Sequence, residues 1–460
     1  MKKRAKTADV ELNEYIPDKA APIIEMIEKE AELRLLFREL SLLAEQHRKV
    51  TVLYYFDGLR VSQISKALRL SESMVKFLLF KSRKILKEGM NMDRTKGDLS
   101  FNPGRMKLMG FGNGKSEEGA KPFPIKWEQF EKNLVAQNIL LACYHERCTV
   151  EEISLQIGVA VPYLEHDLNE LCDSDVLLLR GGRYETSVVI FTKDFTLEAN
   201  AKTSVFQQEI AETVERFLDE RLSDIRAIGF HQGGHDEGLL KWHITQLIME
   251  QAVLRKYYTS LNLKFPKYAG HEVFVCGVED STSQGGGLTI AYHNACGDRI
   301  ECLEFFVSSL SEKILDFGYI GKSTSRINTA LDIAKGKMNG FSENDVLEVA
   351  DFIKNGWAKK DDEDLRLCIP VYTAEQYEQV IAVMNNVTDK IMNITREMVA
   401  ISTDILLQHT PASLKKEAKA ISWLKRHDLA MTKPVEIMRD NGVLRKVTDN
   451  EHPTIYVLLK

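Results

Sequence analysis

LSLLAEQHRKVTVLYYFDGLRVSQISKALRLSESMVKFLLFKSRKILKEG, residues 40–89, is the stretch that decides the fold of the N-terminal part. Its first helix is expected to end near Phe56, where an Asp-Gly pair supplies a turn. A short helix over 61–68 follows. Ser71 then precedes a longer amphipathic pattern, and its hydroxyl is suited to accept a backbone N–H from the first turn of the next helix. This order predicts a helix-turn-helix.

The second helix of this motif is expected to run to about Lys87, and it divides into two faces at the period of an α-helix. The packing face is predicted to hold Val75, Leu78, Leu79, Ser82, Ile85 and Leu86. The outward arc is predicted to hold Glu72, Ser73, Lys76, Phe77, Lys81 and Lys84. Small polar residues therefore come first and lysines later, as in a helix whose first turns read bases and whose later turns contact phosphates.

Positive charge is concentrated around this motif in a chain that is acidic as a whole. The 460 residues carry a formal net charge of −6. Between Arg48 and Lys107, fourteen basic residues stand against five acidic ones, which is a net charge of +9. Such a field is typical of a protein that binds a phosphate backbone. The alternative is a three-helix packing module with a solvated lysine face, and the charge together with the capping serine favours DNA binding.

The motif resembles region 4 of bacterial sigma factors, of the extracytoplasmic-function type. The residues that carry the resemblance are Tyr54-Tyr55-Phe56-Asp57-Gly58-Leu59, Ile64, Leu68, Ser71-Glu72-Ser73, Val75-Lys76, Arg83-Lys84 and Leu86. The resemblance implies a module that reads the minus-35 element of promoter DNA while docked on the RNA polymerase core. Apolar residues of the preceding helix then pack the module, and part of their surface is expected to serve the polymerase flap.

The expected DNA contacts are divided between bases and phosphates. Nearest the bases we expect Ser71, Glu72, Ser73, Lys76 and Phe77. Toward the phosphates we expect Lys81, Arg83, Lys84 and Lys87. Three positions depart from the family pattern: Arg69 replaces a turn glycine, Met74 a small hydroxyl residue, and Leu78 an arginine of the reading helix. The loss of one bidentate arginine removes about 1–3 kcal/mol of base discrimination.

Region 2 of sigma factors, which binds the polymerase clamp and melts the minus-10 element, needs a helical bundle of its own. About 30 residues precede the motif in this sequence. We therefore expect region 2 to be absent from the chain, to be encoded upstream of the start, or to be supplied by another protein.

The rest of the chain predicts a modular, mainly α fold, with the helix-turn-helix domain followed by winged-helix-like α+β modules joined by linkers. The expected segments are a flexible lead-in (1–30), the helix-turn-helix (31–90), a linker (91–124), a winged-helix-like domain (125–195), a helical segment (196–265), a small α+β domain (266–335), a helix-plus-wing module (336–375) and a C-terminal helical domain ending in a β-hairpin (376–460). The three β-prone runs within 271–308 predict one small antiparallel sheet.

The second helix of the winged domain is acidic, which argues against a second DNA contact. It carries Glu165, Asp167, Glu170, Asp173 and Asp175 without a lysine or arginine. About five negative charges would face a phosphate backbone, so this domain is expected to bind protein or to pack internally. The long appendage resembles the C-terminal extension of some extracytoplasmic-function-type sigma factors, and a regulatory protein is its expected partner.

The sequence predicts neither an enzyme nor a cofactor. Three histidines, His231, His235 and His243, are residues of the type that binds metal ions. Gly233-Gly234, however, interrupts the helix that would align them. Gly321-Lys322-Ser323-Thr324 lacks the first glycine and the strand of a phosphate loop. Neither a membrane span nor a secretory signal is evident, which predicts a cytoplasmic protein.

Two further hypotheses stand beside a DNA-binding regulator. In one, the region 4 unit no longer binds DNA, and the winged modules assemble a scaffold with protein partners. In the other, the chain is the C-terminal part of a complete sigma factor whose true start lies upstream.

Overall fold

The helices of residues 40–90 form where the sequence predicts them. The structure, a computed structural model, describes residues 32–33, 35–92, 94–279, 288–294, 300–307, 324–336, 341–361, 364–426, 428–448, 451–453 and 456–459. Helical residues 35–42 precede α2 (Glu45–Tyr55), α3 (Val61–Leu68) and α4 (Glu72–Met90). One apolar cluster joins the three labelled helices, and its buried members are Val50, Ile64, Val75, Leu78 and Leu79.

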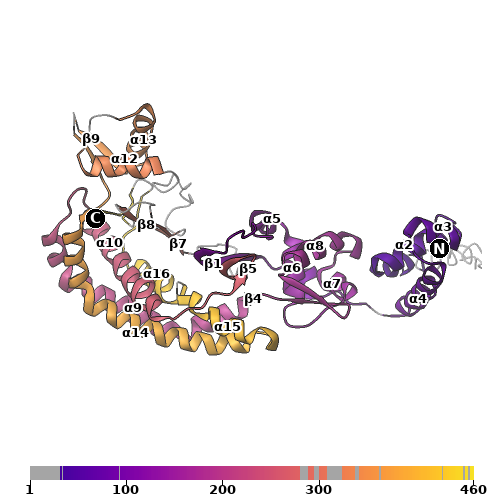
Figure 1. The fold of residues 1–460 in the computed structure, drawn as a ribbon. Helices are drawn as coiled ribbons and strands as arrows, with labels where there is room; N and C mark the ends of the chain where they lie inside the picture. The colour runs from indigo at the N-terminus through magenta and orange to yellow at the C-terminus, as the bar shows by residue number, and fades with distance from the viewer. Residues whose placement is uncertain are drawn as a thin grey trace, which may run out of the picture. The chain divides into compact units, whose positions relative to one another are not determined.

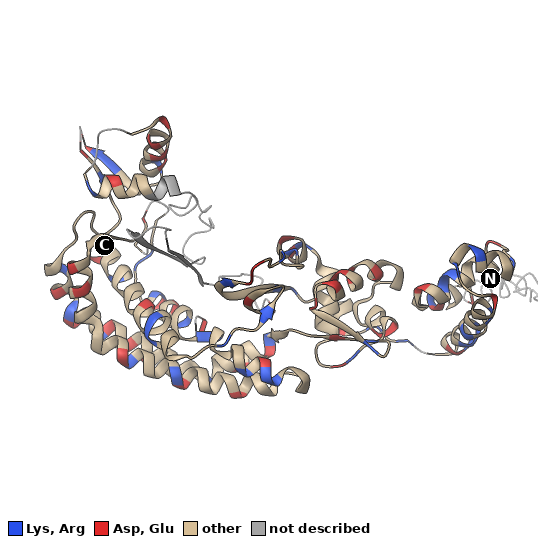
Figure 2. Cartoon of the chain, in the orientation of Figure 1, with Lys and Arg blue, Asp and Glu red and all other residues tan. Residues whose placement is uncertain are grey.

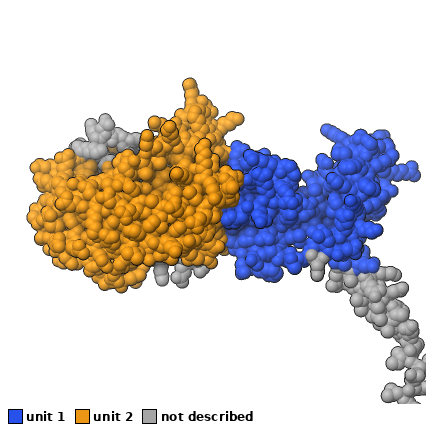
Figure 3. Space-filling model, turned by 90° about the horizontal axis from the view of Figure 1, so that it is seen from below, with its two compact units in different colours: residues 1–104, 128–187 blue, residues 105–127, 188–460 orange. Residues whose placement is uncertain are grey.

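The chain divides into two compact units, coloured in Figure 3. Unit 1 holds residues 1–104 and 128–187, and unit 2 holds residues 105–127 and 188–460. The chain therefore leaves unit 1 after residue 104, returns to it at 128, and leaves it again after 187.

After α4, the rest of unit 1 has the predicted order of helices followed by a hairpin (Figure 1). Its elements are η1 (Asp98–Ser100), α5 (Trp127–Lys132), α6 (Leu134–Ala142), α7 (Val150–Ile157), α8 (Val161–Asp173), β2 (Leu177–Arg180) and β3 (Arg183–Thr186). Gly181 and Gly182 both have positive φ, 58° and 78°, as the tight turn of an antiparallel hairpin requires. Thr149 and Glu152 form a capping box at the start of α7.

Unit 2 begins with a strand in the segment that was predicted to be a linker. β1 (Met106–Ser116) pairs antiparallel with β6 (His271–Glu279), whose other side pairs with β4 (Val189–Phe191) and β5 (Lys267–Tyr268). The linker prediction for 91–124 is therefore corrected over these residues. Gly110 and Gly112 pair with Val275 and Val273 of β6, Gly114 has a φ of 76° where the register shifts, and the first side chains of the strand, Met106 and Leu108, are buried.

A helical layer forms the largest core of unit 2. Its longest members are α9 (Lys193–Ile228) and α14 (Ala374–Gln408), which pack along one another (Figure 1). The others are α10 (Glu237–Met249), the π-helix η2 (Glu250–Tyr257), α11 (Tyr258–Ser260), η4 (Ala412–Leu414), α15 (Lys415–Ile421), η5 (Ser422–Lys425), η6 (Asp428–Thr432) and α16 (Lys433–Asp440). The fully buried Trp242 lies in this core and donates its indole N–H to the Arg445 carbonyl at 2.8 Å.

A second sheet of unit 2 has the order β11-β12-β8-β7. Its strands are β7 (Leu288–Asn294), β8 (Ile300–Val307), β11 (Val371–Thr373) and β12 (Tyr456–Leu459). Two predictions are corrected here. The runs within 271–308 do not form one sheet, because β6 pairs in the first sheet and β7 with β8 in the second. The chain does not end in a hairpin, because β12 pairs with β8 and, in parallel, with β11.

The helix-plus-hairpin unit predicted within 336–375 includes an earlier helix. α12 (Thr324–Ala334) and α13 (Glu343–Lys354) pack with the antiparallel pair β9 (Ala358–Asp361) and β10 (Asp364–Leu367). The fold class is mainly α, with a helix-turn-helix and α+β modules, as predicted. None of the helices described is long and apolar enough to span a bilayer.

Candidate nucleic-acid interface

The start of α4 is fixed by the two residues that the sequence singled out in the turn. Ser71 caps the helix, and its Oγ accepts the Met74 N–H at 3.2 Å. Arg69 ends α3 in the left-handed region, with φ 54° and ψ 40°. A glycine adopts this conformation without a steric penalty, whereas an arginine does not. The turn therefore keeps the backbone path that a glycine would give it.

The inner face of α4 agrees with the predicted packing stripe except at Ile85. The residues Val75, Leu78, Leu79, Ser82 and Leu86 are buried, and Gly89 joins them. Ile85 is 36% exposed, because helical rotation places it at the margin of the buried face. Leu78 is 3% exposed and belongs to the core, so the position at which the resemblance expects a reading arginine points into the domain.

The outward arc of α4 holds every predicted residue, and all are exposed: Glu72, Ser73, Lys76, Phe77, Lys81 and Lys84. At 100° per residue, the centre of this arc is the stripe Ser73, Phe77, Phe80 and Lys84. Phe77 is 51% exposed and Phe80 is 66% exposed. The sequence analysis did not select Phe80, although the same helical rotation places it beside Phe77. Figure 2 shows basic residues along α4.

The basic side chains predicted for phosphates lie in three different surroundings. Lys81 Nζ lies 5.6 Å from the centre of the Phe77 ring. Lys84 pairs loosely with Glu88 at 3.8 Å along the helix, and Lys87 is exposed one turn later. Arg83 instead donates to the Tyr55 hydroxyl and lies 5.5 Å and 5.9 Å from the ring centres of Tyr55 and Tyr54. Arg83 is thus held at the side of the arc by the domain's own aromatic residues.

A buried ion pair anchors the C-terminal end of α4 to the helical stretch 35–42. Glu39 is 1% exposed, and both its oxygens accept from Arg94, at 2.7 Å to 3.1 Å. Arg38 also donates to Glu39 at 2.8 Å, and to the Gly89 carbonyl at 3.1 Å. His47 approaches Ser82 Oγ at 3.1 Å, and burial lowers the pKa of its imidazole. These contacts orient the helix that presents the lysines.

An apolar groove of about 510 Å³ lies between the helical stretch 35–42, α2 and the last turns of α4. Its lining is Leu36, Leu40, Thr51, Tyr55, Phe56, Arg83, Leu86, Lys87, Met90 and Asn91. Tyr55 and Phe56 are about half exposed there. The groove offers two aromatic rings and two basic groups to a partner.

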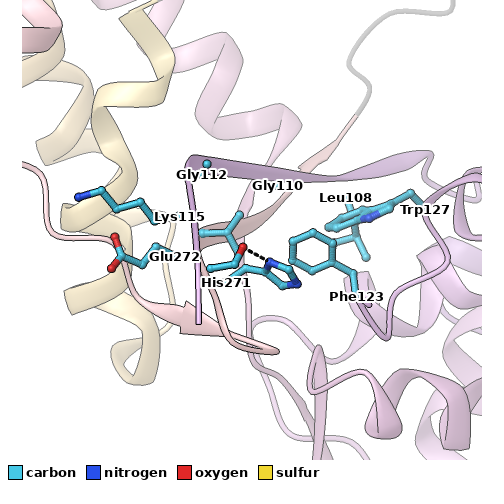
Figure 4. Close-up of a pocket in the computed structure, with 11 residues that line it drawn as sticks. Leu108, Gly110, Gly112, Lys115, Phe123, Trp127, His271 and Glu272 are labelled. Carbon is cyan, nitrogen blue, oxygen red and sulfur yellow. Dashed lines mark hydrogen bonds between the residues drawn. The ribbon is translucent and has the colours of Figure 1, made fainter. Parts of the chain in front are cut away.

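A different hollow, of about 500 Å³, lies in unit 2 over the glycines of β1 (Figure 4). Gly110 and Gly112 form its floor, and Phe123 and Trp127 stand beside them. The imidazole of His271 lies at its rim, where Nδ1 meets Ser116 Oγ at 2.7 Å and Nε2 meets the Lys121 carbonyl at 2.8 Å. Both ring nitrogens are engaged, so the hollow does not offer His271 as a general base.

The histidines considered as metal ligands have other partners or surroundings. His243 is fully buried, with Nδ1 3.0 Å from the Pro453 carbonyl and Nε2 2.8 Å from the Tyr372 hydroxyl. Burial lowers the pKa of His243 to about 3, and that of His235 to about 4. Within the described ranges, no three His, Cys, Asp or Glu side chains are grouped to hold a metal ion. Gly321-Lys322-Ser323 lies outside the described residues.

The acidic helix α8 contacts the helix-turn-helix within unit 1. Arg48 of α2 donates to Glu165 of α8 at 2.6 Å, and also to the Leu43 carbonyl at 2.6 Å. Asp167 accepts from Asn133 at 2.7 Å. Part of the acidic face of α8, which was expected to bind protein or to pack internally, therefore forms contacts within unit 1.

Comparison with known families identifies the helix-turn-helix. Residues 33–86 match the family model described as "Sigma-70, region 4", which confirms the resemblance over this segment. No curated protein and no solved structure matches the chain.

Proposed function

We propose, from the sigma-70 region 4 unit at residues 33–86, that this protein regulates transcription by binding promoter DNA through α4 while docked on the RNA polymerase core. The observation that supports the proposal best is the outward arc of α4. Its serine cap and small polar residues come first, its lysines follow, and all of them are exposed.

The charges around α4 suit a phosphate backbone on both sides of the helix. Lys76 and Lys81 flank the central stripe on opposite sides, and Lys84 and Lys87 continue it toward the C-terminal end. In a major groove, this arrangement directs the first turns toward base edges and the lysines toward the two strands. Glu72 is the acidic residue of the first turn, where it also interacts favourably with the helix dipole.

Docking on the polymerase is assigned to the apolar groove lined by Tyr55 and Phe56. It lies around the C-terminal half of α4, away from Ser71 and Ser73. The serine-capped start of α4 and the groove are therefore separate surfaces on one small domain, and Lys87, which is placed toward the phosphates, borders the groove. Tyr and Arg are enriched in protein interfaces, and Tyr55 and Arg83 both line this groove.

The experiment compares two double variants of the intact chain with equal loss of charge. Lys81→Ala with Lys84→Ala removes two arc lysines, while Lys359→Ala with Lys360→Ala removes two exposed lysines of β9 as the control. Binding to promoter-length duplexes is titrated over a range of salt concentrations. The arc variant should bind all duplexes more weakly, and the slope of log K against log salt should fall by about 1.8.

The control should keep the parent slope, and both variants should still bring down core polymerase. If the salt slope of the arc variant is unchanged, α4 does not contact the DNA and the proposal is wrong. Loss of polymerase binding in the arc variant alone contradicts the separation of the two surfaces.

A further inference from the structure

The centre of the exposed arc of α4 is apolar, which is unusual for a helix that contacts nucleic acid. Phe77 and Phe80 are 51% and 66% exposed, three residues apart on the same face. They lie between Ser73 and Lys84 on the central stripe. The two rings thus occupy the positions nearest to whatever α4 faces.

Arginine, asparagine and glutamine, the side chains that form planar bidentate pairs with bases, are scarce on this arc. Arg83 is the one arginine within residues 71–84, which include neither asparagine nor glutamine. The guanidinium of Arg83 is engaged by Tyr55, and Leu78 is buried in the core. The bidentate pairs that arginine forms with guanine, and asparagine or glutamine with adenine, are therefore not offered from the centre of the arc. Glu72, Ser73 and Lys76 in the first two turns remain able to form hydrogen bonds with bases, whereas Phe77 and Phe80 at the centre of the arc require another property of the base pairs.

The thymine C5-methyl is the apolar group that base edges present in the major groove, and phenylalanine is among the side chains that contact it. We propose that Phe77 and Phe80 recognise thymine methyl groups, so that the DNA element is selected chiefly by the placement of its thymines. The inference rests on the proposed function, because it requires α4 to lie in the major groove.

The spacing of the two rings suits neighbouring bases. Residues three apart on an α-helix are separated by about 4.5 Å along its axis. Successive bases on one strand are about 3.4 Å apart. Phe77 and Phe80 can therefore contact two adjacent thymines, while Lys76 and Lys81 on either side reach phosphates. The stacking of Lys81 Nζ on the Phe77 ring, at 5.6 Å, leaves the opposite face of that ring for the base.

The test uses DNA that differs only by methyl groups. Duplexes are first selected from a random library with the intact chain at low salt. Each thymine of the selected site is then replaced by deoxyuridine, which keeps the hydrogen bonds and removes the methyl. We expect two adjacent positions at which this replacement weakens binding about threefold to fivefold, the effect of uncovering one methyl group.

Variants assign the effect to the two rings. Phe77→Ala and Phe80→Ala should each bring the thymine-to-deoxyuridine affinity ratio at one of these positions close to one. Phe56→Ala is the matched control, because Phe56 is also about half exposed in the same domain but lies in the groove. It should leave both ratios unchanged. Lys81→Ala should weaken binding to both duplexes equally.

The possible failures are distinguishable. If the intact chain binds no duplex at low salt, the proposed function itself is wrong. If it binds DNA but thymine and deoxyuridine duplexes bind equally at every position, the methyl-reading inference is overturned while DNA binding stands. If the phenylalanine variants lose core polymerase and keep the affinity ratios, the two rings form a protein-docking surface, and the inference is likewise overturned.

Discussion

Arg69 occupies a turn position whose backbone conformation an arginine disfavours. The turn between α3 and α4 needs a left-handed residue at this position, and Arg69 adopts φ 54° there. The left-handed conformation costs a residue with a Cβ about 1–2 kcal/mol. The strain is small compared with the apolar cluster that ties α3 to α4, so the fold tolerates it.

Arg69→Gly should therefore stabilise the helix-turn-helix. Glycine relieves the left-handed strain but also gives the unfolded chain more freedom, so the net gain should be about 0.5–1 kcal/mol. Hydrogen exchange of the α3 and α4 amides, measured in the intact chain at increasing urea concentration, gives the change in the free energy of unfolding of this domain. Arg69→Ala is the control, because alanine keeps the Cβ and with it the left-handed strain, so it should gain nothing. Equal effects of the two substitutions would show that Arg69 is not strained.

At the scale of single residues, the sequence predicted much of the candidate interface. The capping role of Ser71 and the exposure of Phe77 followed from local spacing. Ile85 was misplaced because periodicity does not show where a buried face ends. Phe80 is assigned to neither predicted face, although its helical rotation follows from the sequence.

Among the elements, α4 illustrates a competition between helix propensity and packing. Gly89 lies in its last turns, where alanine would normally favour the helix by about 1 kcal/mol. A Cβ at this position, however, would overlap the carboxylate of Glu39. That carboxylate is buried and held by Arg94, so it cannot move away without breaking the ion pair. Packing should outweigh propensity.

Gly89→Ala is accordingly expected to destabilise the domain, by about 2–4 kcal/mol, because it disturbs a buried ion pair. Urea unfolding monitored on α4 measures the change. A double-mutant cycle with Glu39→Ala supplies the control, since in that background alanine at 89 meets no carboxylate and should lose most of its penalty. A gain of about 1 kcal/mol for the single variant, as propensity alone gives, contradicts this account.

Strands were harder to predict than helices, for a physical reason. The C-terminal helical domain predicted over 376–460 does begin within a long helix, α14, because a long periodic pattern is sufficient evidence for a helix. β1 has glycines at 110, 112 and 114, and its stability comes from β6, more than 150 residues later. Nothing within β1 itself identifies this partner. The same holds for β12, which was predicted to be half of a hairpin and pairs with β8 and β11 instead.

For the whole molecule, the sequence predicted a modular and mainly helical chain, which is what forms. It did not predict that unit 2 would take in residues 105–127 from before the second part of unit 1. Local patterns locate elements, whereas long-range strand pairing decides to which unit they belong. The compact units therefore differ from the sequential segments expected from composition.

The buried imidazole of His243 should make the stability of unit 2 depend on pH. Its pKa is lowered from 6.5 to about 3 in the folded protein, so folding favours the neutral form. His243 makes its full contribution to the free energy of unfolding above about pH 6.5, where the imidazole is neutral in both the folded and the unfolded protein. This contribution is lost progressively as the pH falls from about 6.5 toward 3, at up to about 1.4 kcal/mol per pH unit.

His243→Gln tests this dependence, because its amide can still donate to the Pro453 carbonyl and accept from the Tyr372 hydroxyl. Thermal unfolding between pH 7 and pH 4.5, followed by the near-ultraviolet signal, should show a shallower loss of stability for the variant than for the parent protein. His166→Gln is the control, since the His166 side chain is 81% exposed. Parallel curves for parent and His243→Gln rule out His243 as the source of the pH dependence.

The pairing of β1 with β6 also sets an order of events during synthesis. The ribosome releases β1 about 150 residues before β6, which at about 5–20 residues per second is a delay of roughly 8–30 s. Throughout this delay the nascent β1 lacks the strand with which it pairs, and an unpaired apolar strand is prone to aggregate. Of its eleven residues, Met106 and Leu108 are the ones buried in the mature fold. A strand this rich in glycine is thus suited to remain soluble on the ribosome until its partner is made.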